Sequence, residues 1–423
     1  MASIDIVENM DRRAYLAMTA SATTALCLAG CAGSEPLDSS DTDSKDGGTA
    51  DPGDVTPASG VVEPGSEDDF EDLSAWSEDA GSLSADSDRS LIGSQSAYLE
   101  VGSSATIGRL SKTFDEPIDV SNVVPGVAIT AESVVSPWIR LVDENGNRID
   151  YRRTVTGGIP FMRYNFGIND LDDSFDETAV TEVHLQLWTA EGTKRGIWFD
   201  DFHFVPRPET GKVMIQFDDT HVTDHSEAMP LLSEYGYGAV TFVNPNYVGK
   251  EVDSYERLSE GQLADLHDAG WCLSNHTETH ANMPTLDRDE QERELRNGKV
   301  WLEERGYDEG ARYFAYPFGK FDATTVELVD EYHEIGFAGG HPVQGYTSNT
   351  ALASRISEPD REQAEIAFER TARMPGITCV FYHELEGEYR TDFEDMLEVL
   401  HEYESAGEID VILPPDLERD LLF

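Results

Sequence analysis

The chain has 423 residues, a length that accommodates two or three domains with cores of their own. It contains 83 Asp and Glu against 30 Lys and Arg, which gives a formal net charge of −53. This balance excludes nucleic acid as a partner class, because phosphate binding needs basic patches that the sequence lacks. Molar salt would screen the self-repulsion of so many acids, so we expect a protein adapted to high salinity. A hydrophobic content of 39% argues against an acidic disordered chain.

The first 31 residues have the pattern of an export signal rather than of a folded domain. Arg12-Arg13 precede a weakly apolar run that ends in Leu28-Ala29-Gly30-Cys31. This resembles a twin-arginine signal followed by a lipobox, as in haloarchaeal-type lipoproteins. The resemblance implies export in the folded state and lipidation of Cys31, so that a lipid anchor alone joins the protein to the membrane at the cell surface. A plain cleaved secretory signal is the alternative, and it also places the mature protein outside the cytoplasm.

Residues 32–65 are rich in Ser, Asp, Thr, Gly and Pro and have almost no large apolar side chains. Such a segment cannot bury a core, and we expect a solvated acidic tether.

Residues 66–206 show short alternating runs that are broken by turn residues, which predicts a β-sandwich of the jelly-roll type. The turn sequence at 143–146 predicts a hairpin. The last run, 197–204, resembles the final strand of galactose-binding-like jelly rolls, which are often accessory carbohydrate-binding modules. Four aromatic residues either stack on sugar rings or fill the core: Trp138, Tyr151, Trp188 and Trp198. The clearest strand-like runs are 96–101, 138–142, 182–188 and 196–204.

From 211 to 423 strand-like runs alternate with helical ones, which predicts βα units around a parallel sheet. Ser259 and Gln262 form a capping-box pattern at the start of one helix. About seven repeats indicate an α/β barrel of reduced size, whose chemistry is expected at the carboxyl ends of the strands. The expected strands are 213–217, 239–243, 271–274, 312–316, 337–338, 377–382 and 410–413, and the helices are 227–235, 259–270, 285–305, 322–335, 362–370 and 393–403.

Polar residues with the chemistry of a metal site follow several of these strands. Two histidines four residues apart can converge on one cation, and a carboxylate from another strand completes an N₂O ligand set with positions left open for water and substrate. Cys272 and Cys379 each precede a histidine by four residues, and we interpret them as small buried hydrophobes, with metal ligation as the alternative. The strand-end sequences are Asp218-Asp219, Asn275-His-Thr-Glu-Thr-His280, Tyr316-Pro-Phe-Gly319 and His383-Glu384.

These motifs, in this order, resemble the polysaccharide deacetylase family (carbohydrate esterase family 4, NodB homology domain) over residues 212–415. The resemblance implies a distorted (β/α)₇ barrel. It also implies a divalent metal, Zn²⁺ first and Co²⁺, Ni²⁺ or Mn²⁺ as alternatives. The implied metal ligands are Asp219, His276 and His280, the base is Asp218 and the acid is His383. Tyr316, Pro317 and Phe318 would contribute to substrate and oxyanion binding, and Thr277 would fix the turn between the ligands.

Two positions depart from the family pattern. The arginine that steadies the base in the third motif is replaced by Ala315, and the fourth motif has no clear counterpart in residues 339–342. His341 and Glu384 are candidate substitutes. His221 and His225 lie close to the first motif in the sequence, and they either line the cleft or belong to an exposed loop.

The sequence therefore predicts a metal-dependent hydrolase that removes N-acetyl groups from a surface or extracellular polysaccharide. Two alternatives remain. The same site could act as an O-acetyl esterase or small-amide hydrolase, or the chain could be a surface carbohydrate-binding protein without catalytic activity.

Overall fold

The computed structural model describes residues 60–423, which all belong to one compact unit. The predicted export signal, Cys31 as the predicted lipidation site and residues 32–59 of the predicted tether lie outside the described residues. Within residues 60–423, none of the helices combines the length and the apolar character that crossing a membrane requires.

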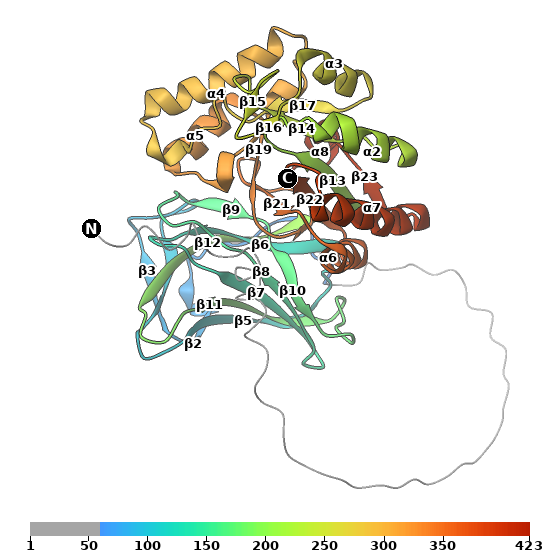
Figure 1. Cartoon of the computed structure of the whole chain (residues 1–423). Helices are drawn as coiled ribbons and strands as arrows, with labels where there is room; N and C mark the ends of the chain where they lie inside the picture. The colour runs from blue at the N-terminus through green and yellow to red at the C-terminus, as the bar shows by residue number, and fades with distance from the viewer. Residues whose placement is uncertain (1–59) are drawn as a thin grey trace, which may run out of the picture. The chain divides into compact units, whose positions relative to one another are not determined.

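Two antiparallel sheets of six strands each occupy the chain from β1 to β12 (Figure 1). Alternation along the strands explains them: in β7, Ile139 and Leu141 are buried in the shared core, and their neighbours Arg140 and Val142 face outwards. One sheet contains β1 (Gly65–Asp68), β3 (Ser82–Asp86), β4 (Ser96–Val101), β12 (Arg195–Pro206), β6 (Val123–Thr130) and β9 (Met162–Tyr164). The other contains β10 (Gly167–Leu171), β8 (Arg148–Arg152), β7 (Pro137–Asp143), β11 (Val180–Trp188), β5 (Ile107–Ile118) and β2 (Ser77–Ala80).

The predicted hairpin at 143–146 is confirmed, because β7 and β8 pair on either side of it and Gly146 N–H donates to the Asp143 carbonyl over 3.0 Å. The four aromatic residues divide into two groups. Tyr151 and Trp198 are buried, as a core role requires. Trp188 is 48% exposed at the end of β11, and its ring centroid lies 6.2 Å from that of Trp138.

Seven parallel strands close into a barrel in the second half of the chain, because β22 pairs with both β21 and β13. The predicted number of strands is therefore right, but one member is wrong. The run at 410–413 was expected in the ring, and the strand found there, β23 (Ile409–Val411), pairs with β13 outside it. The ring is β13 (Gly211–Phe217), β14 (Val240–Val243), β17 (Cys272–Asn275), β18 (Tyr313–Ala315), β19 (Ile335–Gly339), β21 (Ala353–Ser357) and β22 (Gly376–Tyr382).

The sequence did not predict β21, because polar side chains interrupt any apolar run there: Ser354, Arg355 and Ser357 leave only Ala353 and Ile356 as apolar residues. A two-residue strand, β20 (Val343–Gln344), adds to β22 in the antiparallel direction. A small hairpin of β15 (Glu251–Val252) and β16 (Tyr255–Glu256) lies between β14 and the next helix.

Helices follow most barrel strands, as predicted (Figure 1). The predicted capping box is confirmed: Gln262 N–H donates to Ser259 Oγ over 3.3 Å, and Ser259 N–H donates to Gln262 Oε1 over 2.9 Å. A π-helical turn, Asp224–Ala228, precedes α2 and lies close to the first motif in the sequence. The helices are α2 (Met229–Tyr235), α3 (Glu260–Asp268), α4 (Arg288–Glu303), α5 (Ala323–Tyr332), α6 (Arg361–Arg373), α7 (Glu388–Ala406) and α8 (Pro414–Asp420).

One position in the βα series has no helix. Between β19 and β21, the described residues 340–352 contain only the short strand β20. On this side the barrel packs against the two-sheet domain, and one apolar cluster includes Tyr164 and Phe166 of that domain together with Ala351 and Leu352. The two-sheet domain thus takes the place of the missing helix.

Candidate active site

The candidate site lies at the carboxyl ends of β13, β17, β21 and β22. Side chains alternate along a strand, so the residues that face the barrel interior on β13, Met214 and Gln216, are followed by Asp218. On β22 the same alternation leads from Cys379 to His383. Two carboxylates that are adjacent in sequence are thereby placed in different environments.

Asp219, His276 and His280 meet around one point. Their ligand atoms all lie within 4.8 Å of one another. Oδ1 of Asp219 is 3.0 Å from Nε2 of His280 and 3.4 Å from Nε2 of His276. Asp219 Oδ1 is buried, and no donor among residues 60–423 makes a hydrogen bond to it.

The chemistry of these three residues fits a cation. Nδ1–H of His276 donates to the Ala315 carbonyl over 2.7 Å, which leaves Nε2 with a free lone pair. Burial lowers the pKa of His280 to about 4, so its imidazole is neutral at neutral pH. Burial alone would raise the pKa of Asp219, but the two imidazoles beside it hold this pKa well below its usual range. Three lone pairs that face one another would repel unless a positive ion lay between them, and an N₂O set suits Zn²⁺ and similar ions.

The backbone between the two histidines is held from β14. Thr277 and His280 both have left-handed conformations, with φ of 68° and 58°. Asn244 is buried, and its Nδ2 donates to the carbonyls of His276 and Thr277. Thr277 N–H donates to Asn275 Oδ1 over 3.0 Å, whereas the buried Thr277 hydroxyl makes no hydrogen bond to any described residue. The turn predicted to depend on Thr277 is therefore held by the side chains of Asn244 and Asn275.

Asp218 is paired with an arginine that the sequence did not reveal. Both guanidinium NH₂ groups of Arg355 donate to it, one to Oδ1 and one to Oδ2, each over 2.8 Å. Arg355 comes from β21, is 2% exposed and lies 4.0 Å from the centroid of the Phe381 ring. Burial would raise the pKa of Asp218, but the Arg355 charge outweighs it and the pKa is lowered. Arg355 thus supplies the charge that is missing at Ala315.

His383 is paired with a second residue that follows β21. Nδ1–H of His383 donates to Glu358 Oε1 over 2.8 Å. Burial would lower the pKa of His383, but the Glu358 hydrogen bond and the nearby carboxylates raise it to about 9. The imidazole is therefore protonated at neutral pH. One short segment, 355–358, serves both the predicted base and the predicted acid.

The predicted substrate-binding segment 316–318 divides between core and surface. Tyr316 is fully buried and its hydroxyl donates to the Ala351 carbonyl over 2.8 Å, so its side chain cannot reach a substrate. Pro317 is also buried. Phe318 is 59% exposed, has a φ of 58°, and its ring centroid lies 4.4 Å from that of His280. Of these three side chains, only Phe318 faces the site.

Other candidates have different roles. His221 is buried, with Nε2 3.8 Å from Glu384 Oε2, so the exposed-loop interpretation is wrong for this residue. Nε2 of His225 lies 3.1 Å from Oδ2 of Asp265. Glu358, not His341 or Glu384, contacts His383.

Cys272 and Cys379 are buried and free, as interpreted from the sequence. Burial raises the pKa of both thiols to about 12, and neither thiol belongs to the cluster of Asp219, His276 and His280.

Comparison with known proteins matches a part of the chain that includes Asp218, Asp219, His276 and His280. The sequence model described as polysaccharide deacetylase matches residues 206–336. The chain is 24% identical over 172 residues to YxkH of Bacillus subtilis (strain 168), provisionally named a polysaccharide deacetylase, covering 41% of this chain and 55% of the relative. It is 28% identical over 141 residues to the poly-β-1,6-N-acetyl-D-glucosamine N-deacetylase of Staphylococcus epidermidis, covering 30% of this chain and 48% of the relative. The chain thus spans about half the length of these curated relatives.

Among solved structures, the family 4 carbohydrate esterase from Streptomyces lividans in complex with acetate is 15% identical, with a TM-score of 0.36, and covers 48% of this chain and 92% of that one. Residues 206–336 are therefore similar to polysaccharide deacetylases, and the relative from Bacillus subtilis carries that description in its name.

Proposed function

We propose that this protein is a metal-dependent hydrolase that removes N-acetyl groups from a polysaccharide outside the cytoplasm. One observation carries the proposal. The only close cluster of metal-ligating side chains that residues 60–423 contain lies beside a buried carboxylate fixed by Arg355 and a histidine fixed by Glu358. A ligand set, a base and an acid with separate partners are what metal-assisted hydrolysis of an amide needs. The Staphylococcus epidermidis relative, named as an N-deacetylase of an N-acetylglucosamine polymer, supports this substrate class.

The residues divide the reaction between them. A divalent ion on Asp219, His276 and His280, Zn²⁺ first and Co²⁺, Ni²⁺ or Mn²⁺ as alternatives, would acidify a water and polarise the acetyl carbonyl. Asp218 accepts the proton of the attacking water, and Arg355 keeps this carboxylate ionised and oriented.

The protonated His383 then donates a proton to the departing amine from Nε2, because Nδ1–H is bound to Glu358. The backbone N–H of Phe318 is our candidate donor to the developing oxyanion.

The test is acetate release in molar salt. Purified protein is incubated with N-acetylated oligosaccharides, with and without a chelator and with the metal restored. Asp218→Asn should abolish most of the release. The matched control is Asp150→Asn, because Asp150 is also a buried carboxylate bound by an arginine, but on the two-sheet domain. Nε and one terminal NH₂ group of Arg140 donate to it over 2.6 and 2.8 Å. Equal release by the wild type and Asp218→Asn would refute the assigned base.

Two alternatives share the same site or surface. An O-acetyl esterase or small-amide hydrolase would use the same residues, and comparing amide and ester substrates of one sugar separates the activities. A carbohydrate-binding protein without catalytic activity would bind glycans without turnover, whether or not His383 is replaced.

A second function is favoured by the aromatic pair on the two-sheet domain. We infer that this domain is a jelly-roll β-sandwich that holds the polysaccharide on Trp138 and Trp188, because apolar sugar faces stack on exposed aromatic rings. Trp188→Ala should weaken retention on a polysaccharide affinity gel and leave the turnover of short oligosaccharides unchanged. Trp198→Phe is the control, because Trp198 is buried. Unchanged retention of Trp188→Ala would refute this site.

We also infer export through the twin-arginine signal and attachment by a lipid on Cys31, on the strength of the leader sequence alone. Cys31→Ala should release the protein from the cell surface into the medium. Release of the wild type in the same proportion would contradict the anchor.

A further inference from the structure

We propose that Arg153 of the two-sheet domain positions the catalytic site. It fixes β21, and Arg355 on this strand and Glu358 directly after it bind the base and the acid. The inference rests on the proposed function and adds a positioning residue to it. Arg153 touches neither the metal ligands nor the two catalytic residues. It acts through β21.

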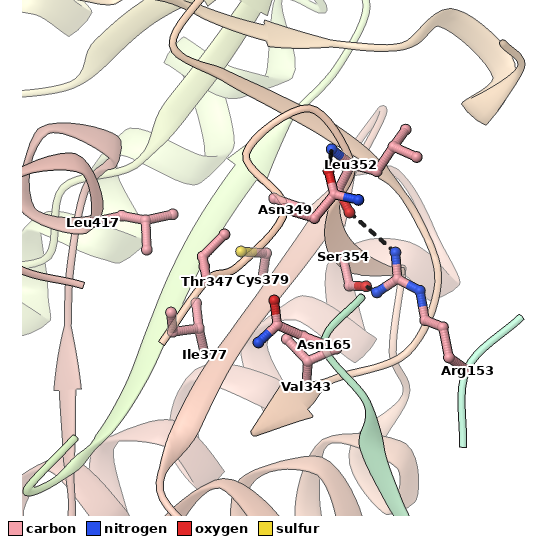
Figure 2. A pocket seen from close by; sticks show the side chains of 11 residues that line it. Arg153, Asn165, Val343, Thr347, Asn349, Leu352, Ser354, Ile377, Cys379 and Leu417 are labelled. Atoms are coloured by element: carbon pink, nitrogen blue, oxygen red, sulfur yellow. Dashed lines mark hydrogen bonds between the residues drawn. The ribbon is translucent and has the colours of Figure 1, made fainter. Parts of the chain in front are cut away.

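Arg153 follows β8 and reaches across to the barrel. One of its terminal NH₂ groups donates to Ser354 Oγ, and the other donates to the Leu352 carbonyl over 3.0 Å (Figure 2). The side chain is only 6% exposed, and within residues 60–423 no carboxylate forms an ion pair with it. A buried charge with neutral partners is costly. Stability alone is thus a poor explanation for an arginine at this position.

The contact matters because of the alternation along β21. Ser354 faces the two-sheet domain and Arg355 faces the barrel interior, where it binds Asp218. Arg153 on one face and Asp218 on the other therefore hold two consecutive residues of the same strand. Glu358, which binds His383, comes three residues later. A shift of this strand would displace the partners of the base and the acid together.

The segment that leads into β21 is held by the same domain. Asn165 Nδ2 donates to the Tyr346 carbonyl over 2.6 Å, and Asn165 Oδ1 accepts from Ser348 N–H over 2.8 Å. Asn349 Nδ2 donates to the Arg163 carbonyl over 2.9 Å. These bonds satisfy polar groups that a helix would otherwise satisfy internally.

The interface around Arg153 is tightly filled. Side chains of the two parts enclose a cavity of about 10 Å³, at the lower limit of the space that one water needs (Figure 2). This volume excludes a ligand site and leaves little freedom for β21 to move. The cavity is lined by Arg153, Asn165, Thr347, Asn349, Leu352 and Ser354, together with five apolar or small residues of the barrel.

The test compares Arg153→Met with Arg153→Lys and with the control Arg140→Met. Arg140 is also an arginine of the two-sheet domain, but its partner Asp150 belongs to the same domain. A misplacement of about 1 Å costs a reaction on the order of 10²-fold, so we expect Arg153→Met to lower kcat by about 10- to 100-fold. KM for a short oligosaccharide, the bound metal and the thermal midpoint should change little by comparison. Arg153→Lys should recover part of kcat, because it restores one donor.

Hydrogen exchange measured by mass spectrometry provides a readout that does not need activity. The amides of residues 353–358 should exchange faster in Arg153→Met than in the wild type, and at the wild-type rate in Arg140→Met. If Arg153→Met does not fold, Ser354→Ala removes only the hydroxyl and should show the same changes on a smaller scale. Failure of the wild type to release acetate would refute the proposed function and leave the exchange data to decide whether Arg153 holds β21. A folded Arg153→Met with kcat within twofold of the wild type, or with wild-type exchange at 353–358, would overturn the inference.

Discussion

Replacing Arg355 with methionine tests how Asp218, the proposed base, is held. The substitution keeps a long side chain beside Phe381 and Phe242, where the guanidinium now lies 4.0 and 5.6 Å from the ring centroids. It removes both hydrogen bonds to Asp218 and leaves that carboxylate buried without its countercharge. Burial then raises the pKa of Asp218, since the charge that lowered it is gone.

The size of the effect follows from the geometry. Breaking a buried pair by removing one partner costs about 3–5 kcal/mol of stability. Because the folded-state pKa of Asp218 is lowered, this stabilisation is present above the ordinary carboxyl pKa and is lost as the pH falls. A positioned base contributes about 10²- to 10⁴-fold to a reaction, so kcat should fall by at least about 10²-fold at neutral pH. The loss should shrink as the pH rises and the remaining carboxylate ionises.

The assay is acetate release at several pH values, together with thermal unfolding and metal analysis of the same preparations. Arg140→Met is the matched control, because it breaks a bidentate pair with Asp150 far from the metal ligands in the sequence. A folded, metal-loaded Arg355→Met with kcat within threefold of the wild type would show that Asp218 needs no arginine, or that it is not the base.

Three further predictions concern the acid, the metal and the turn. Because the pKa of His383 is raised to about 9, activity should decline only as the pH passes that value. The stability that the protonated His383 contributes is complete below a pH of about 6.5 and should be lost as the pH rises through about 9. Glu358→Gln should move the alkaline limb of the kcat profile to lower pH, and an unmoved limb would exclude His383 as the acid. Chelation should abolish turnover and lower the thermal midpoint of the wild type but not of His280→Ala, which should bind no stoichiometric metal by elemental analysis. Asn244→Ala should weaken metal affinity by about 10- to 100-fold in competition with a chelating dye, since Asn244 holds the backbone of the ligand turn, and unchanged affinity would assign that turn to Asn275.

The sequence was informative where function is local. Asp218 and Asp219 directly follow the apolar strand β13, and the two histidines lie within five residues of the end of β17, so their chemistry could be inferred from order and spacing. Their convergence is a property of the barrel, in which the carboxyl ends of parallel strands share one edge.

The partners of Asp218 and His383 could not be predicted from the sequence. Arg355 lies 137 positions after Asp218, on a strand whose inward residue is a charge rather than an apolar side chain. Periodicity therefore offers no signal at β21. The run at 410–413 predicts a ring strand instead, because it is apolar. The role of Arg153 depends on a contact about 200 positions away and on the missing helix between β19 and β21, neither of which composition or spacing reveals.

If the guanidinium rather than its strand is what the base requires, an arginine introduced at Ala315 should replace Arg355. Ala315 is fully buried, and it belongs to the apolar cluster that includes Phe337 of β19 and Phe242 of β14, so its side chain faces the barrel interior. In the wild type an added arginine would meet Arg355 and should be destabilising. In the double variant Ala315→Arg, Arg355→Met, the methionine removes the positive charge beside Asp218, and the guanidinium of the new arginine would replace it. We expect the double variant to recover about 10-fold in kcat over Arg355→Met, with a base-dependent pH profile shifted back towards that of the wild type. A folded, metal-loaded double variant no more active than Arg355→Met would mean that the direction from which the guanidinium reaches Asp218 matters as much as its charge. The position of β21, which Arg153 fixes, would then matter too.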